Sequence, residues 1–281
     1  MRKIEYKTIV DTVKQMCITS NYDLPQDVMN TFDKFIKTES SPLGKSILMK
    51  CKENAEIAQK ERVPICQDCG LAVFFIKLGN EVFIDNGLLN DAINEGVKQG
   101  YAEGYLRKSS LKDPLYDRVN TGDNTPAIVH LELVKGENLE ITMAPKGGGA
   151  ENMSRLQMFP PSAGEKGVED FIVNAVVESG GNPCPPTVVG VGIGGTFEKV
   201  AYLAKKALLR ELGSSNPNPR YDKLEKRILQ RINDSGIGPQ GLGGNTTSFA
   251  VHIETHPCHL ASLPVAVNIN CHAHRHIHKI I

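Results

Sequence analysis

Three cysteines stand at places in the chain where a thiolate could bind a metal. Cys66, Cys184 and Cys271 each lie in a loop or at a strand end, beside glycine, proline or amide-bearing residues. Three thiolates from separate loops can hold a cubane iron-sulfur cluster and leave its fourth iron without a protein ligand. Such an open iron is a Lewis acid that can bind the hydroxyl and carboxylate groups of a substrate. From spacing alone, this chemistry is one option among several.

Cys66 also forms a C-x-x-C pair with Cys69. Pairs of this kind serve in zinc binding or in dithiol redox chemistry. The chain contains one such pair, and the residues between the two thiols are an amide, Gln67, and a carboxylate, Asp68. The residues alone therefore leave open a zinc or redox pair, a structural thiol, and a role for Cys66 as a single ligand.

The histidines are concentrated at the end of the chain, where seven of the eight fall in the last thirty residues. This density suggests a zinc site. Against a zinc site, the histidines of Cys271-His272-Ala273-His274-Arg275-His276 alternate along an extended segment that ends the chain. Polar residues near a chain end are usually solvated, so we favour solvated histidines over a dedicated metal site.

Four glycines lie between an apolar strand and a helix, in a pattern similar to a dinucleotide fingerprint. They are Gly190, Gly192, Gly194 and Gly195. No second strand ending in an acidic residue follows at the required distance, because the helix leads into Ser214-Ser215-Asn216-Pro217. We therefore attribute the glycines to close packing of a helix on a strand.

The composition is that of an ordinary globular protein. Of the 281 residues, 40% are hydrophobic and 23% are charged, which is enough apolar material for one large domain or two smaller ones. Thirty-two basic and thirty-two acidic residues cancel. The net charge therefore gives no reason to expect a nucleic acid or an anionic membrane as a partner, and a small-molecule role is favoured.

The N-terminus and the cysteines both favour a cytoplasmic protein. The start, Met-Arg-Lys-Ile-Glu-Tyr-Lys, is not followed by an apolar run long enough for a signal peptide or a membrane span. Seven cysteines with irregular gaps, in a chain without an export signal, argue against a disulfide framework. Metal-binding or catalytic thiols become the alternative, with buried inert thiols expected for most of the set.

Hydrophobic periodicity predicts a mixed α/β fold over residues 1–281, with a helical N-terminal region followed by α/β subdomains. Helices are predicted within the first sixty residues and over 90–106, 164–179, 196–212 and 221–232; strands are predicted over 71–78, 82–84, 128–134, 139–143, 187–193, 248–253 and 263–270. Lys135-Gly136-Glu137-Asn138 is predicted to join two of these strands as a hairpin. In this arrangement the three cysteines fall on loops and strand ends.

The chain resembles the α subunit of two-subunit class I fumarases and of the closely similar tartrate dehydratases. The resemblance spans nearly the whole chain, and the combination of motifs is far more specific than any one of them. The motifs that carry it are Cys66-Gln67-Asp68, Asp113-Pro114-Leu115, Asn120-Thr121-Gly122-Asp123-Asn124-Thr125-Pro126-Ala127, Lys146-Gly147-Gly148-Gly149, Asn182-Pro183-Cys184-Pro185-Pro186, Gly190-Val191-Gly192-Ile193-Gly194-Gly195-Thr196 and His256-Pro257-Cys258-His259-Leu260-Ala261-Ser262-Leu263-Pro264.

This resemblance implies a set of site residues. Cys66, Cys184 and Cys271 are implied as the ligands of a 4Fe-4S cluster. The residues implied at the substrate are Gln67, Asp68, Arg107, Gly148 and His259, of which Asp68 and His259 are the catalytic ones. A guanidinium fork suits a carboxylate, and a glycine-rich turn lets backbone N–H groups approach a ligand closely. Asp68, beside a ligating thiolate, is suited to exchange the proton of a departing hydroxyl group.

Two features depart from the family pattern. Cys69 occupies a position where a small hydroxyl residue such as threonine is expected, so it is either a spare thiol or an alternative ligand. Single-chain relatives continue into a C-terminal swivelling domain, whereas this sequence ends at Ile281. We therefore expect a separate β subunit to supply that domain and the base for the C3 proton, in a tetramer of two α and two β subunits.

The implied activity is reversible hydration of fumarate to L-malate, with dehydration of L(+)-tartrate as the alternative. Both use a small dicarboxylate, and the motifs do not separate the two substrates. A non-catalytic iron-sulfur or zinc protein that uses Cys66 and Cys69 for redox sensing is the rival from another class. Electron-transfer clusters normally take four protein thiolates, often from one stretch of sequence, and the cysteines here are scattered.

Overall fold

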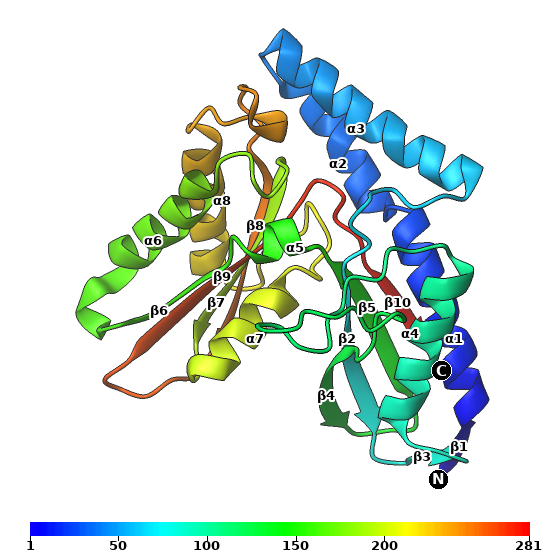
Figure 1. Cartoon of the computed structure of the whole chain (residues 1–281). Coiled ribbons are helices and arrows are strands. Elements are labelled where there is room, and N and C mark those ends of the chain that lie inside the picture. Colours follow the sequence, from blue (N-terminus) through cyan, green and yellow to red (C-terminus); the bar gives the residue numbers. More distant parts are fainter. The chain divides into compact units, whose positions relative to one another are not determined.

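Helices and strands of this chain gather into two units, each with its own β-sheet (Figure 1). The structure is a computed structural model that describes all of residues 1–281. Unit 1 comprises Met1–Pro25, Asn54–Gly148 and Arg275–Ile281, and unit 2 comprises Gln26–Glu53 and Gly149–His274. Helices and mixed parallel and antiparallel strands confirm the predicted mixed α/β class.

Unit 1 is built on a four-stranded sheet with the order β10-β5-β2-β4. Its strands are β2 (Leu71–Gly79), β4 (Ile128–Val134), β5 (Leu139–Lys146) and β10 (Ile277–Ile280). Helices α1 (Tyr6–Tyr22) and α4 (Leu89–Glu103) lie side by side over one face of the sheet (Figure 1). Alternate residues of β2, Phe74 and Ile76, are buried there with Ile9 and Val13 of α1. A second, two-stranded sheet pairs β1 (Arg2–Glu5) with β3 (Val82–Asp85).

The predicted hairpin between β4 and β5 is wrong. Strand β2 lies between the two, parallel to β4 and antiparallel to β5. The connection 135–138 instead crosses the end of β2, where the Gly79 amide donates to the Asn138 carbonyl at 2.9 Å. A Cβ on Gly79 would lie 2.3 Å from the Gly136 carbonyl oxygen, so the crossing requires glycine there. The residues of the turn do not indicate that a third strand, β2, lies between the two strands that the turn connects.

Unit 2 is built on a sheet with the order β6-β9-β7-β8. Its strands are β6 (Arg155–Phe159), β7 (Thr187–Gly194), β8 (Ser248–His256) and β9 (Leu263–Asn270). Helices α6 (Gly164–Ser179) and α8 (Pro219–Asn233) share one hydrophobic cluster with this sheet. Helix α7 (Phe197–Ala207) packs on the other face so closely that a Cβ on Gly190 would lie 2.1 Å from the Ala204 carbonyl oxygen. The packing explanation is confirmed for Gly190 and for Gly192, where a Cβ would lie 2.2 Å from the Val200 carbonyl oxygen. Gly194 and Gly195 instead have positive φ values of 90° and 76°.

The remaining elements are short or lie at the border of the units. Helix α2 (Gln26–Thr38) belongs to unit 2, and α3 (Pro42–Glu61) begins in unit 2 and ends in unit 1. The Ser41 hydroxyl accepts the Gly44 amide at 3.1 Å, which caps α3 ahead of its first-turn proline. Helix α5 is the single turn Gly148–Glu151, and 3₁₀ turns lie at Pro161–Ala163 and Pro239–Gly241.

The C-terminal segment is buried at Ala273–Arg275 and then forms a strand, contrary to the expectation of a solvated end. His274 and Arg275 are 1% and 2% exposed. The chain then forms β10, which pairs antiparallel with β5. Pairing with a sheet holds a terminus that its polar composition alone would leave in solvent. None of the helices combines the length and the apolar composition needed to cross a membrane.

Candidate active site

The Cys66–Gly70 loop of unit 1 carries three of the predicted site residues on the connection between α3 and β2. The Cys66 thiol donates to the Gln67 side-chain oxygen at 3.1 Å, and the Asp68 amide donates to the Cys66 sulfur at 3.4 Å. Cys66 and Asp68 are half-buried and Gln67 is exposed. One backbone N–H group thus faces the sulfur that is predicted to be a metal ligand.

Asp68 is held by two backbone amides through its two carboxylate oxygens. Oδ1 accepts the Gly70 amide at 3.0 Å, and Oδ2 accepts the Gly148 amide at 2.7 Å. Gly148 comes 80 residues later, two residues after the end of β5. The antiparallel pairing of Leu71 with Lys146 brings the two segments to the same sheet end. Unit 1 thus joins the Gly148 amide to the carboxylate that was predicted to exchange a proton.

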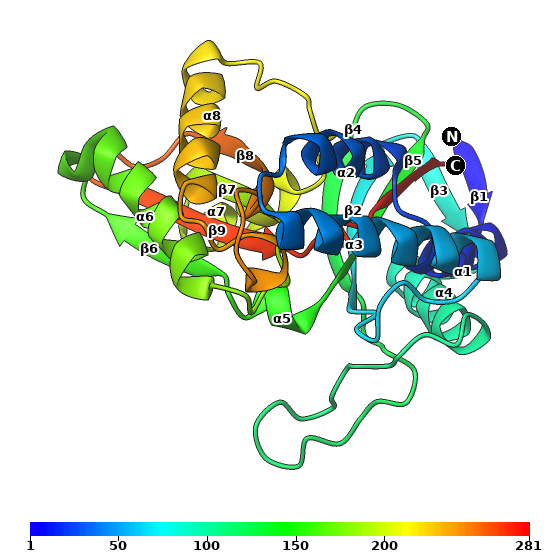
Figure 2. The ribbon, with the colours of Figure 1, turned by 90° about the horizontal axis from the view of Figure 1, so that it is seen from above.

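The Arg107 side chain is exposed on the long loop between α4 and β4, which extends away from the helices and sheet of unit 1 in Figure 2. Its backbone amide donates to the sulfur of Cys69 at 3.1 Å. Cys69 is 1% exposed, and its thiol donates to the Cys66 carbonyl at 3.8 Å. Burial raises the pKa of the Cys69 thiol although the Arg107 amide acts against the rise, so the group stays neutral near pH 7.

Two buried polar side chains bind the backbone of the Cys66–Gly70 loop from neighbouring segments. The Tyr101 hydroxyl of α4 lies 3.0 Å from the carbonyl oxygens of both Cys69 and Gly70. Arg275 donates to the Asp68 carbonyl at 2.9 Å and to the Asn21 side chain at 2.8 Å. Because buried polar groups are costly to leave unpaired, these bonds hold the loop in one conformation.

Cys184 and Cys271 lie together in unit 2. Cys184 sits in the loop before β7, and Cys271 directly follows β9, whose end pairs with the start of β7 through Asn270 and Val188. The His272 amide donates to the Cys184 carbonyl at 3.1 Å. Gln240 also stabilises the loop that carries Cys184, because its side chain donates to the Pro185 carbonyl at 2.8 Å. Cys184 is exposed and Cys271 is half-buried.

A third thiol, Cys51 on α3, neighbours the pair. Burial raises the pKa of Cys51 to about 11, and the charges of nearby Cys184 and Cys271 add to the rise. Nothing in the sequence distinguishes Cys51, because its neighbours are typical of an ordinary helix. Its position makes it the thiol that must be separated experimentally from the two predicted ligands of unit 2.

His259 is placed at the other end of the same sheet. It lies in the loop between β8 and β9, where its Nδ1 accepts the Ala261 amide at 3.1 Å. Strand β7 runs from the sheet end near Cys184 to the sheet end near His256. At about 3.3 Å per residue, its length separates the two ends by roughly 25 Å. Unit 2 therefore does not bring His259 to Cys184 and Cys271, and its assignment as an active-site residue stays a prediction.

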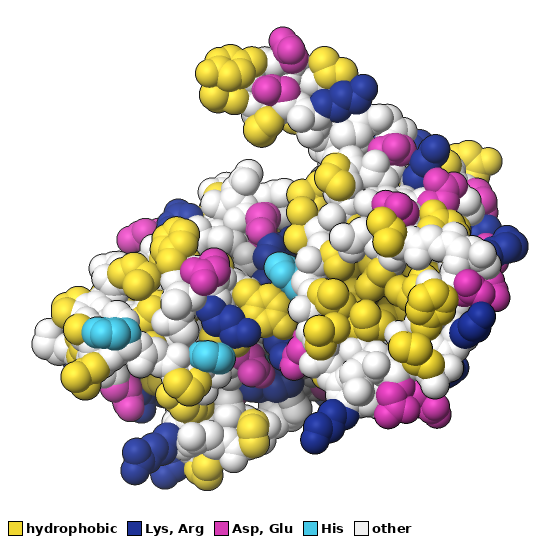
Figure 3. Space-filling view, turned by 90° about the horizontal axis from the view of Figure 1, so that it is seen from below, with side chains coloured by type: hydrophobic (Ala, Val, Ile, Leu, Met, Phe, Trp, Pro, Cys, Tyr) yellow, Lys and Arg dark blue, Asp and Glu magenta, His cyan; other side chains and the backbone are white.

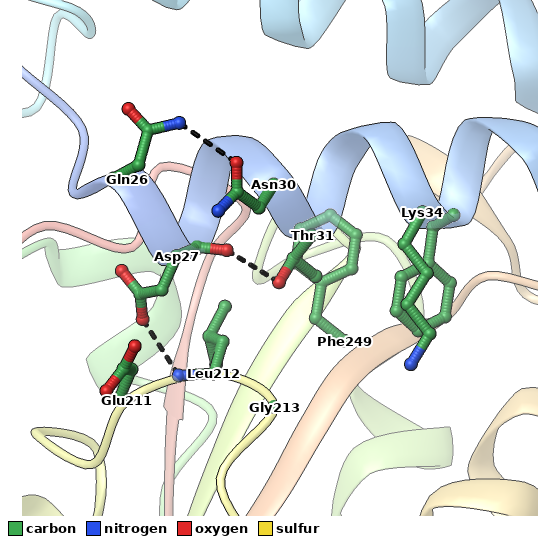
Figure 4. A pocket seen from close by; sticks show the side chains of 10 residues that line it. Gln26, Asp27, Asn30, Thr31, Lys34, Glu211, Leu212, Gly213 and Phe249 are labelled. Carbon is green, nitrogen blue, oxygen red and sulfur yellow. Dashed lines mark hydrogen bonds between the residues drawn. The ribbon is translucent and has the colours of Figure 1, made fainter.

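A pocket of about 330 Å³ in unit 2 lies apart from every predicted site residue. It is formed by α2, the 211–213 segment and Phe249 (Figure 4). The Asp27 carboxylate faces this segment and accepts the Leu212 amide at 2.8 Å (Figure 4). Several polar groups of the pocket thus bind one another, and none of its lining residues is a predicted site residue.

The donor set fits an iron-sulfur cluster in its chemistry. Cys66, Cys184 and Cys271 are accessible thiols on loops, and none of the seven cysteines forms a disulfide. No three His, Cys, Asp or Glu side chains lie close enough together to hold a metal ion. The predicted site residues divide between the units: Cys66, Gln67, Asp68, Arg107 and Gly148 belong to unit 1, and Cys184, Cys271 and His259 to unit 2.

Sequence reasoning missed the residues that hold the loops in place. Asn124 had a signal in the sequence, because it belongs to the Asn120–Ala127 motif. The structure shows that it is fully buried, with a positive φ of 63°. Tyr101 lies in the helix predicted over 90–106, where nothing in the sequence indicates that its hydroxyl binds the loop. Arg275 lies among histidines and had no signal at all, since its partners are Asn21 and Asp68.

Comparison with known proteins gives one family. The family model described as "Fumarate hydratase (Fumerase)" matches residues 10–279. A protein of Methanocaldococcus jannaschii that carries the provisional name L(+)-tartrate dehydratase subunit alpha is 40% identical over an alignment of 285 residues, which covers 97% of each chain. The L(+)-tartrate dehydratase subunit alpha of Escherichia coli K12 is 36% identical over 256 residues, covering 90% of this chain and 84% of its own.

Proposed function

The chain belongs to the fumarate hydratase (Fumerase) family, and from this premise we propose that it is the cluster-binding α subunit of a hydro-lyase that interconverts fumarate and L-malate. The observation that carries the proposal is the match of the family model over residues 10–279, which includes every predicted site residue. The substrate is a small dicarboxylate. The reaction adds water across its carbon-carbon double bond, or eliminates water in the reverse direction.

Cys66, Cys184 and Cys271 would hold a 4Fe-4S cluster. When bound, such a cluster with one iron free of protein ligands supplies a Lewis acid for the substrate's hydroxyl and carboxylate groups. The accessible loop positions of the three thiols support this assignment. So does the hydrogen bond from the Asp68 amide to the Cys66 sulfur, because outer partners of this kind orient a metal ligand.

The residues of unit 1 supply recognition and proton transfer. The exposed Arg107 guanidinium binds a substrate carboxylate through two parallel hydrogen bonds. Gln67 offers an exposed amide to the substrate hydroxyl. Asp68, held at both oxygens by the Gly70 and Gly148 amides, exchanges the proton of the departing hydroxyl. The Gly148 amide therefore acts through Asp68, in addition to any direct bond to substrate.

The base that removes the C3 proton belongs, in this proposal, to a separate β subunit. The relatives are named as alpha subunits, which supports a second chain. A surface feature supports it too: edge strand β4 exposes Ile128, Leu131 and Leu133 at 44%, 54% and 72%. Exposed apolar edge strands invite pairing with another chain. Figure 3 shows that hydrophobic side chains also interrupt the charged surface on the face drawn there. The assembly would be a cytoplasmic tetramer of two α and two β subunits.

L(+)-tartrate is the second candidate substrate, because both relatives described above are named tartrate dehydratase subunits. Tartrate is a dicarboxylate with one more hydroxyl group than malate. The residues proposed for the carboxylates and the departing hydroxyl would serve both substrates. Discrimination would then depend on one additional polar contact to the second hydroxyl.

The test is an anaerobic hydratase assay of the chain alone and of the chain co-expressed with a β-subunit homologue. Fumarate, L-malate and both enantiomers of tartrate are offered to each preparation. The proposal predicts turnover of fumarate and L-malate by the pair and negligible turnover by the chain alone. Selective turnover of L(+)-tartrate would establish the second candidate. Full activity of the chain alone, shown free of partner by mass spectrometry, would contradict the two-subunit assignment.

A further inference from the structure

The strongest unexplained feature of unit 1 is that a buried thiol contacts the backbone of an exposed arginine. Cys69 is 1% exposed, yet its sulfur accepts the Arg107 amide at 3.1 Å while its thiol donates to the Cys66 carbonyl at 3.8 Å. The side chain of Cys69 therefore connects the loop that carries Cys66 and Asp68 to the residue that carries the guanidinium. These segments are 38 residues apart in the chain.

Asn124 makes a second connection between the same two segments. Its side-chain oxygen accepts the amides of Ser109 and Ser110 at 2.6 and 3.1 Å, and its nitrogen donates to the Gly70 carbonyl at 3.2 Å. Asn124 is fully buried. The backbone from Arg107 to Ser110 is thus bonded at both ends to the Cys66–Gly70 loop, by Cys69 at one end and by Asn124 at the other.

We infer that Cys69 is a positioning residue, which sets the place of the Arg107 guanidinium relative to Asp68 by holding the Arg107 amide, with Asn124 as its second anchor. Cys69 is then neither a cluster ligand nor a redox thiol. This inference rests on the proposed function in so far as Arg107 binds a substrate carboxylate. The position of a long side chain is well defined only if its backbone is held in place. Binding of a carboxylate by a planar guanidinium depends on that position, because both hydrogen bonds must form at once.

The first experiment measures the kinetics of the co-expressed complex with the dicarboxylate that it turns over. Cys69→Ala removes the acceptor and should raise KM about three- to tenfold, as expected for loss of one hydrogen bond. The value of kcat should stay within about twofold, because binding and not chemistry is impaired. Cys69→Thr keeps an acceptor in its hydroxyl and should recover most of the loss. Iron content should stay at the wild-type level in both variants.

Two further variants separate positioning from general destabilisation. Cys17→Ala is the matched control, since Cys17 is another fully buried thiol of the same hydrophobic cluster, and it should leave KM unchanged. Asn124→Gly removes the amide of the second anchor, and its positive φ of 63° suits glycine. This variant should raise KM in the same way as Cys69→Ala, and it keeps the inference testable if Cys69→Ala does not fold.

The second experiment does not depend on activity. Hydrogen exchange is followed by mass spectrometry on peptides that cover residues 107–110. Exchange should be faster in Cys69→Ala than in the wild-type chain and unchanged in Cys17→Ala, because only the former removes the partner of the Arg107 amide.

In an active complex, the KM and the iron content of Cys69→Ala decide the role of Cys69. A KM for Cys69→Ala within about twofold of wild type, or loss of iron from that variant, overturns the positioning role. If the wild-type complex turns over none of the dicarboxylates, the proposed function fails, and the exchange comparison alone then decides the role of Cys69. Unchanged exchange in Cys69→Ala would in that case reject it.

Discussion

The carboxylate of Asp68 accepts the amide hydrogen of Gly148, with 2.7 Å between Oδ2 and the nitrogen. A second amide, of Gly70, binds the other carboxylate oxygen at 3.0 Å. An asparagine cannot accept both bonds, because one of its two terminal atoms is a donor. The two hydrogen bonds that hold the loop therefore require a carboxylate at residue 68, as does the proposed proton exchange.

Asp68→Asn should lower kcat by about 10²- to 10⁴-fold, the usual contribution of a positioned acid-base group. Iron content should be retained, since Cys66 is unchanged. Asp113→Asn is the matched control, because Asp113 caps an exposed turn of the same unit by accepting the amides of Leu115 and Tyr116. Steady-state kinetics of both variants decide the matter, and similar kcat values for the two would remove Asp68 from the reaction.

Arg107→Lys should weaken substrate binding although the charge is kept, because an ammonium group cannot form the paired bonds of a guanidinium. Arg107→Ala, which truncates one partner of the charged pair, should cost roughly 2 to 5 kcal/mol of binding in a desolvated site. Arg62→Lys is the control, an exposed arginine of unit 1 paired with Asp23 at 3.0 Å. KM and inhibition by a non-reactive dicarboxylate give the readout. Unchanged constants in Arg107→Lys would exclude a contact with substrate.

Serine variants at Cys66, Cys184 and Cys271 should each abolish cluster retention, because each removes one of three anchors. Cys17, Cys69 and Cys258 should tolerate the same change. Cys51 is the most demanding control, since it lies beside Cys184 and Cys271 and its pKa is raised to about 11. Iron and sulfide are measured after anaerobic purification. Retention in Cys184→Ser together with loss in Cys51→Ser would show that the wrong thiol was assigned in unit 2.

An ion-pair network between α6 and α8 should make the stability of unit 2 depend on pH. Glu169 accepts from Arg227 Nε at 2.7 Å and from Arg231 Nη1 at 2.9 Å. These hydrogen bonds and the two positive charges lower the pKa of Glu169, although burial acts against them. Glu169→Gln should therefore lower the free energy of unfolding at neutral pH by about 1 to 2 kcal/mol, since both arginines are partly exposed.

The sign of the pH effect follows from the lowered pKa. The folded state holds the Glu169 proton less tightly than the unfolded state, so the stabilisation is full above the ordinary glutamate pKa of about 4.3. It is lost as the pH falls through the lowered value. Urea unfolding at several pH values should show wild type and Glu169→Gln converging in acid. Glu165→Gln, at a carboxylate whose side chain is 67% exposed, should differ little from wild type throughout. A gap that widens in acid would contradict the account.

The sequence predicts the elements of this fold better than their arrangement. Helix α6 and strands β4 and β9 have the bounds that their apolar periodicity predicts. Helix α7 was predicted to reach Leu212 but ends at Ala207. The apolar pattern continues through Leu208 and Leu212, but the chain turns there and the Leu212 amide bonds to Asp27, far away in sequence. Contacts of this kind cannot be derived from a local pattern.

The site was predictable where it depends on motifs and unpredictable where it depends on the sheets. The resemblance named Asp68 and Gly148, but only the pairing of β2 with β5 joins them. It also named His259, and the strand directions of unit 2 place that histidine at the sheet end opposite to Cys184 and Cys271. The role of Arg275 could not be predicted, because it depends on hydrogen bonds to Asn21 and Asp68, which are distant in sequence.

Whether the chain binds an iron-sulfur cluster is tested most directly by the metal content of the anaerobically purified wild-type chain. A cluster held by Cys66, Cys184 and Cys271 predicts about four irons and about four sulfides per chain. The broad visible absorption of an iron-sulfur cluster should accompany them and disappear on exposure to a chelator and air. Zinc in place of iron, at about one ion per chain and without sulfide, would contradict the account and favour a zinc site.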